Sequence, residues 1–155
     1  MKPTILLRIA SVIAFLFAAG HTMGAPWTPG EGEKEQAVVE SMKAVHFTVM
    51  GADRSYWDFY FGFGVMISVY LFALAVILWQ SASLAKSDAT RTRPMMLTLL
   101  AAYLIIGVVG WMYFFAIPVI MAAVICVCMI LAWLSAGRQR SQGASSGAAA
   151  LHKSV

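Results

Sequence analysis

Long runs of apolar residues, separated by short polar segments, dominate the chain. The first run covers residues 5–20 and is interrupted only by Arg8. The second covers residues 56–79 with no charge after Asp58, and no charged residue occurs in the third, residues 95–136. Because a hydrocarbon core about 30 Å thick needs about 20 apolar residues per helix, the first two runs each match one crossing and the third matches two. The pattern predicts four membrane-spanning helices.

The third run should divide near its only proline. Proline disfavours helical geometry at the preceding residue and cannot donate a backbone hydrogen bond, so we expect a tight turn around residues 114–118, which include Pro118. Residues 81–94 are polar and are predicted to be a loop. The predicted spans are residues 4–23, 56–79, 95–115 and 118–136.

The segment between the first two spans is the most polar part of the chain. Its apolar residues nevertheless follow a 4-3-4 spacing that places them on one face of a helix, as Val38, Met42, Val45 and Val49 show. We expect an amphipathic helix over about residues 29–50 that lies on the membrane or covers the bundle. The predicted fold is all-α: an integral membrane four-helix bundle with an amphipathic outer-face helix between spans one and two.

Composition supports a membrane protein with a polar tail. The chain is 61% hydrophobic and 12% charged, about half the charge of a typical soluble domain. After residue 136 the sequence changes to a segment rich in Gly, Ser and Ala, which cannot bury enough apolar surface to offset its ordering entropy. We therefore expect one four-span domain over residues 1–136 and a disordered cytoplasmic tail over residues 137–155.

Charge predicts the orientation of the chain. Eight of the eleven Lys and Arg residues lie at the amino-terminal end, in residues 81–94 and in the tail, and the other three lie between spans one and two beside five acidic residues. The positive-inside rule then places both termini in the cytoplasm, with Trp79 and Trp133 near the inner interface of the inner (cell) membrane. The basic residues form no stripe, so nucleic acid is not an expected partner.

The first run has two interpretations. A basic start, an apolar stretch and small residues near position 20 also describe a secretory signal peptide. However, Met23 fits poorly where a cleavage site requires a small residue. Ala10, Ala14 and Ala18 recur every four residues and His21 follows three later, which is a face suited to close helix packing. We favour a retained first span.

The candidate catalytic residues are His21 and Asp58, expected together at the outer ends of spans one and two. An ionisable group at the edge of hydrocarbon is costly and is often kept for function. Ser55 and Asp58 also have the spacing of a helix capping box, with Arg54 available as an ion-pair partner, and we favour this structural role. Gly62 lies on the same helix face, so we expect Asp58 to point toward a neighbouring helix.

Metal binding is not predicted. His21, His46 and a carboxylate from Asp58 or Glu40 are ligand types found in zinc and iron sites, but they form no compact motif. The sequence also contains no phosphate-binding glycine loop, nucleophile elbow or c-type haem motif. The sequence does not identify a cofactor.

Aromatic residues at the start of span two have two interpretations. They form either an interfacial aromatic belt that merges into the packing of the bundle, or an aromatic-walled cavity for a lipid-like or isoprenoid ligand. Tyr60 and Tyr103 are expected to supply hydroxyl groups in an otherwise apolar cavity, and a hydroxyl deep in a bundle should find a hydrogen-bond partner. The other candidate ligand-binding residues are Tyr56, Trp111, His46 and Arg54.

Two motifs carry a resemblance to a known family: His21-Thr22-x-Gly24 and Arg54-Ser55-Tyr56-Trp57-Asp58-Phe59-Tyr60-x-Gly62-Phe63-Gly64. With them, residues 5–136 resemble small bacterial four-span membrane proteins. The resemblance implies a four-helix fold and no particular activity. The layout is also distantly similar to DoxX-like proteins and the sterol-isomerase-like group, in architecture alone.

We favour a non-enzymatic bundle that binds membrane lipid, or a partner membrane protein or second copy of the chain, at its outer face. The alternative is a membrane enzyme or redox accessory that acts on a lipophilic substrate, with His21 and Asp58 in proton transfer. A transporter or channel is less well supported, because four short spans without a central charge offer no ion path unless the protein oligomerises.

Overall fold

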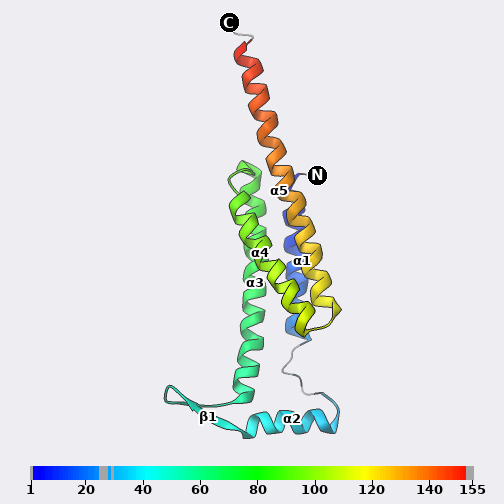
Figure 1. The fold of residues 1–155 in the computed structure, drawn as a ribbon, viewed down its shortest axis with the longest axis vertical. Coiled ribbons are helices and arrows are strands. Elements are labelled where there is room, and N and C mark those ends of the chain that lie inside the picture. The colour runs from blue at the N-terminus through cyan, green and yellow to red at the C-terminus, as the bar shows by residue number, and fades with distance from the viewer. Residues whose placement is uncertain (1, 25–27, 29, 153–155) are drawn as a thin grey trace. The chain divides into compact units, whose positions relative to one another are not determined.

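The computed structural model of the protein is drawn in Figure 1, and it describes the backbone of residues 2–24, 28 and 30–152 and the side chains of these residues as far as Gly137. In chain order, the elements are α1 (Pro3–Met23), α2 (Glu33–Ala44), β1 (His46–Val49), β2 (Ala52–Ser55), α3 (Tyr56–Asp88), α4 (Arg93–Tyr113) and α5 (Ala116–His152). Four helices, namely α1, α3, α4 and α5 as far as Gly137, are long and apolar enough to cross a membrane. The prediction of an all-α, multi-pass membrane protein is confirmed.

The chain divides into two compact units. Unit 1 consists of Met1–Phe17 and Ala73–Val155, and unit 2 is Ala18–Phe72. In unit 1 the first part of α1 and the second part of α3 pack with α4 and α5 as a helical bundle. The hydroxyl of Ser11, which is buried, donates to the backbone carbonyl of Ala75 at 2.8 Å and joins α1 to α3. Fully buried side chains of this unit include Leu7, Leu78, Met96, Tyr103, Ile125 and Met129.

Helices α4 and α5 form the predicted helical hairpin. Their connection is residues 114–115, and Pro118 lies in the first turn of α5, where its missing N–H leaves no helical hydrogen bond unmade. Glycines allow the two helices to approach closely: a Cβ on Gly107 would lie 3.6 Å from the Cβ of Ala122. The predicted turn at 114–118 is confirmed.

Helix α3 is longer than the predicted second span. It continues through the expected loop to Asp88, so the connection to α4 shrinks to residues 89–92. The continuation has a physical basis, because Ser81, Ala82 and Ala85 are buried and keep a helical spacing against the bundle. The helix ends where Asp88 Oδ1 accepts hydrogen bonds from the backbone N–H groups of Thr90 and Arg91, at 3.0 and 3.1 Å.

Unit 2 contains a β-hairpin that the sequence interpretation missed. The expected helix over 29–50 runs only from Glu33 to Ala44, and β1 then pairs antiparallel with β2, with Val49 opposite Ala52. The two-residue loop is Met50–Gly51, and the φ angles of 51° and 84° match a type I′ turn, the turn whose twist suits a hairpin. The helical 4-3-4 spacing therefore continued into a strand by coincidence.

The end of α5 also differs from expectation. A disordered tail was predicted from residue 137, whereas α5 continues to His152. Ala, Gln and Arg are good helix formers, and extending an existing helix needs no new nucleation.

Candidate functional site

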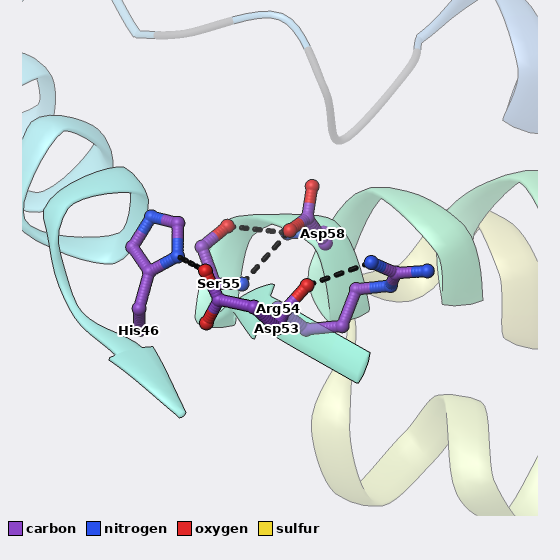
Figure 2. A network of polar contacts seen from close by, with 5 residues as sticks. All are labelled: His46, Asp53, Arg54, Ser55 and Asp58. Carbon is purple, nitrogen blue, oxygen red and sulfur yellow. Dashed lines mark hydrogen bonds and ion pairs between the residues drawn. The ribbon is translucent and has the colours of Figure 1, made fainter. Parts of the chain in front are cut away.

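The predicted capping box forms at the start of α3 (Figure 2). The backbone N–H of Ser55 donates to Asp58 Oδ2 at 2.8 Å, and the backbone N–H of Asp58 donates to Ser55 Oγ at 3.1 Å. Two backbone donors without a helical partner are thereby satisfied, and a carboxylate lies at the positive end of the helix. Asp58 has the structural role that the sequence favoured.

The neighbouring hairpin residues bond mainly to one another (Figure 2). His46 Nδ1 lies 3.0 Å from Asp53 Oδ2 across the hairpin, and Arg54 Nη1 donates to the backbone carbonyl of Asp53 at 2.6 Å. Within the part of the chain that the structure describes, Arg54 forms no ion pair with Asp58, so the expected pair is not made. Both members of the His46–Asp53 pair are exposed, and such surface pairs contribute little to stability.

Within unit 2, Asp58 does not meet the expectation that it points toward a neighbouring helix. Asp58 is exposed, and a Cβ placed on Gly62, on the same face of α3, meets nothing within 4 Å. Within unit 2, the face of α3 that carries Asp58 and Gly62 is therefore open to its surroundings.

The structure does not bring the two candidate catalytic residues together. His21 Nδ1 lies 3.1 Å from Ser68 Oγ, and the two are hydrogen-bonded. Ser68 follows Asp58 by ten residues on α3, which is about 15 Å along the helix axis. Direct proton transfer between His21 and Asp58 is therefore not supported by the geometry.

Two of the predicted ligand-binding residues, Tyr103 and Trp111, line one groove between α4 and α5, here named the α4–α5 groove. Its volume is about 410 Å³, and its wall is almost entirely apolar. Small residues on both helices create the space, because they leave room that larger side chains would fill. The residues that matter for its shape are Tyr103, Gly107, Trp111, Ala122, Ala123 and Cys126.

Tyr103 is the most unusual residue of this groove. Its side chain has no exposed surface, and its hydroxyl has no hydrogen-bond partner among the described residues. The expectation that the hydroxyl finds a partner is therefore not met within the described part of the chain. A buried hydroxyl without a hydrogen-bond partner costs about 1–3 kcal/mol, so an acceptor atom on a bound molecule would relieve this cost.

The remaining predicted ligand-binding residues lie elsewhere. Tyr56 borders a second apolar groove of about 400 Å³ beside the exposed face of α2 that includes Val38 and Met42. Tyr60 is 43% exposed, and its ring centroid lies 5.7 Å from that of Trp57. The predicted ligand set is thus divided, with Tyr56 and Tyr60 in unit 2 and Tyr103 and Trp111 in unit 1. No group of three or more His, Cys, Asp or Glu side chains that could hold a metal occurs among the described residues.

Sequence reasoning missed two contacts between arginine and tryptophan. The guanidinium carbon of Arg8 lies 3.4 Å from the ring centroid of Trp79, and that of Arg93 lies 3.9 Å from the ring centroid of Trp133. The signal in the sequence was that each of these residues stands at or near the end of an apolar run. The pairing itself joins distant parts of the chain and leaves no local pattern.

No protein-family model, curated protein or solved structure matches the chain. The resemblance to small four-span membrane proteins stays a prediction.

Proposed function

We propose that this membrane protein is a non-enzymatic binder of a lipophilic molecule, held in the α4–α5 groove. The observation that carries the proposal is the buried hydroxyl of Tyr103, a residue of the wall of an apolar groove, which has no acceptor among the described residues. A ligand with an oxygen acceptor on an apolar body would fill the groove and, once the groove side chains that cover the hydroxyl move aside, accept the hydrogen bond. Ligand sites commonly combine apolar walls with a few polar groups.

The depth of Tyr103 narrows the ligand class. Tyr103 is the middle residue of the 21-residue α4, about 15 Å from each end and therefore near the centre of a core about 30 Å thick. The ester oxygens of a phospholipid lie outside this core, so an ordinary phospholipid would leave the hydroxyl without an acceptor. An isoprenoid quinone or a long-chain alcohol or ketone can carry an oxygen to that depth.

The decisive experiment is ligand extraction from protein purified in mild detergent, with the bound compounds identified by mass spectrometry. Ala123 is exposed on the groove wall, so Ala123→Phe should fill the groove without disturbing the core. Its neighbour Val124 is 41% exposed, is not part of the wall and points about 100° away around the helix, so Val124→Phe is the matched control.

The wild type and Val124→Phe should retain one lipophilic, oxygen-bearing compound well above its share of the membrane, and Ala123→Phe should lose it. Tyr103→Phe should weaken retention by about 2- to 13-fold, which corresponds to one neutral hydrogen bond. Retention of only bulk phospholipid by the wild type, or equal retention by Ala123→Phe, would overturn the proposal.

The proposal includes the predicted localisation and topology: the protein lies in the inner membrane with both termini in the cytoplasm. The distribution of Lys and Arg supports this orientation. Met50 at the hairpin turn and Ser87 near the end of α3 are both exposed. A membrane-impermeant maleimide added to intact cells should label Met50→Cys and leave Ser87→Cys unlabelled until the membrane is opened. The reverse pattern would invert the topology. Intact mass of the purified protein distinguishes a retained first span from a cleaved one.

A further inference from the structure

The two arginine–tryptophan pairs lie at the end of unit 1 away from the α4–α5 turn. Arg8 of α1 stacks on Trp79 of α3, and its Nη2 donates to Ser83 Oγ at 2.9 Å. Arg93, the first residue of α4, stacks on Trp133 of α5. Each pair therefore links two helices through a guanidinium group held flat against an indole ring.

These pairs are rich in hydrogen-bond donors and lack acceptors. Arg8 Nη1, Arg93 Nε and Trp133 Nε1 are buried atoms with no hydrogen-bond partner among the described residues. Guanidinium and indole groups donate only, so they cannot satisfy one another. Because these three atoms are buried, a ligand reaches the pairs through the exposed part of each guanidinium, and because both arginines are cationic it must carry acceptors and negative charge.

Asp88, the acidic residue nearest to Arg93 in the sequence, neutralises neither arginine. Asp88 pairs with Arg91, with 3.2 Å between Asp88 Oδ2 and Arg91 Nε, and it also accepts the two backbone hydrogen bonds that end α3. Neither Arg8 nor Arg93 forms an ion pair within the described part of the chain. Two partly exposed cations thus face their surroundings without a counter-charge among the described side chains.

The pairs lie at the depth of lipid headgroups. Trp79 is about 35 Å along α3 from Tyr56, and Trp133 is about 26 Å along α5 from Ala116. A hydrocarbon core is about 30 Å thick, so both rings lie near its boundary, where phospholipid phosphates are found.

We infer that the Arg8–Trp79 and Arg93–Trp133 pairs bind the phosphate groups of anionic phospholipids at this membrane interface. A phosphate diester offers acceptors and negative charge, and the stacked guanidinium presents its remaining N–H groups at the ring edge. A headgroup with its own ammonium, as in phosphatidylcholine, would add a cation beside two uncompensated arginines. The pairs therefore select phosphatidylglycerol over phosphatidylcholine, independently of any ligand in the α4–α5 groove.

The test is native mass spectrometry of the full-length protein with phosphatidylglycerol or phosphatidylcholine of identical acyl chains. Arg93→Gln should lower the apparent affinity for phosphatidylglycerol by at least about tenfold, because a charge-assisted hydrogen bond to phosphate is lost. Arg93→Lys keeps the charge but loses the planar stack and fork, so it should fall between the wild type and Arg93→Gln. Arg91→Gln is the matched control, since it removes the same charge from a side chain that is 89% exposed and paired with Asp88.

The outcomes separate the possible explanations. An equal loss in Arg91→Gln and Arg93→Gln would show attraction by net charge and would overturn the inference, as would unchanged selectivity in Arg8→Gln/Arg93→Gln. Displacement of bound phosphatidylglycerol by millimolar inorganic phosphate would show a site for the free anion and not for the headgroup. Arg8→Gln removes the hydrogen bond to Ser83 and could therefore prevent folding. In that case the affinity of Arg93→Gln for phosphatidylglycerol decides the test, since Arg93 has no hydrogen bond to another described side chain. Retention of the groove ligand by Arg93→Gln separates this site from the proposed function.

Discussion

Replacing Tyr103 by phenylalanine tests the central observation, because it removes the hydroxyl and leaves the buried ring in place. Most Tyr→Phe changes at buried positions remove a satisfied hydrogen bond and cost about 0.5–1.5 kcal/mol. Here the hydroxyl has no hydrogen-bond partner among the residues that the structure describes. Its removal should therefore relieve a desolvation penalty of about 1–3 kcal/mol, and the free energy of unfolding should rise.

The sign of the change is the informative quantity. For a chain of this size, a gain of 1 kcal/mol corresponds to about 2–4 °C in melting temperature. We would measure thermal unfolding by circular dichroism in detergent, after removal of bound lipid, and confirm the order of stability by denaturant titration. Tyr60 is 43% exposed, so Tyr60→Phe is the control and should change stability by less than about 0.5 kcal/mol.

A lower free energy of unfolding for ligand-free Tyr103→Phe would refute the reasoning, because it would show that the hydroxyl already has a favourable partner. Adding the groove ligand gives a second check. The ligand should stabilise the wild type more than Tyr103→Phe, since only the wild type can donate the hydrogen bond, so the gap between the two proteins should narrow or reverse.

Three further predictions concern local structure. Ser55→Ala should lose the cap of α3, lower stability by about 1 kcal/mol and speed amide exchange in the first turn of α3, and unchanged exchange would count against the capping box. Ser11→Ala removes the buried hydrogen bond to Ala75 and should cost about 0.6 kcal/mol, up to about 1.7, in denaturant titration; no loss would mean that packing alone joins α1 to α3. Met50→Asn places a residue that tolerates positive φ before Gly51 and should slow amide exchange in the hairpin, whereas faster exchange would argue against the type I′ turn.

The membrane helices were predictable because hydrocarbon imposes length and polarity on every crossing. The capping box at Ser55 was also readable, since it depends on two residues three apart. Helix α3 was cut short in the prediction because residues 81–88 look polar, although the buried positions Ser81, Ala82 and Ala85 keep the spacing of a packed helix. Polarity there marks the exit from hydrocarbon and not the end of the helix.

Contacts between distant residues were not predictable from local patterns. Arg8 was seen only as an interruption and Trp79 only as an interfacial aromatic, because nothing in the sequence links positions that come together through packing. The groove at Tyr103 was partly foreseen, since Tyr103 and Trp111 were both candidates. The expected contact between His21 and Asp58 does not form. Both residues lie near one end of their helices and were expected to meet, but the hydrogen bond to Ser68 places His21 beside a part of α3 ten residues beyond Asp58.

The length of α3 affects how well the protein matches the thickness of the surrounding bilayer. Its 33 residues extend about 50 Å, and the part from Tyr56 to Trp79 alone extends about 35 Å, more than the thickness of a typical hydrocarbon core. α4, with 21 residues, matches that thickness closely. The two helices therefore set conflicting demands on one bilayer, and a thicker membrane favours α3 while a thinner one favours α4. Such mismatch costs fractions of a kcal/mol per Å, and tilt of the helices or local deformation of the lipid relieves it, so the amount of tilt or deformation required changes with the thickness of the bilayer.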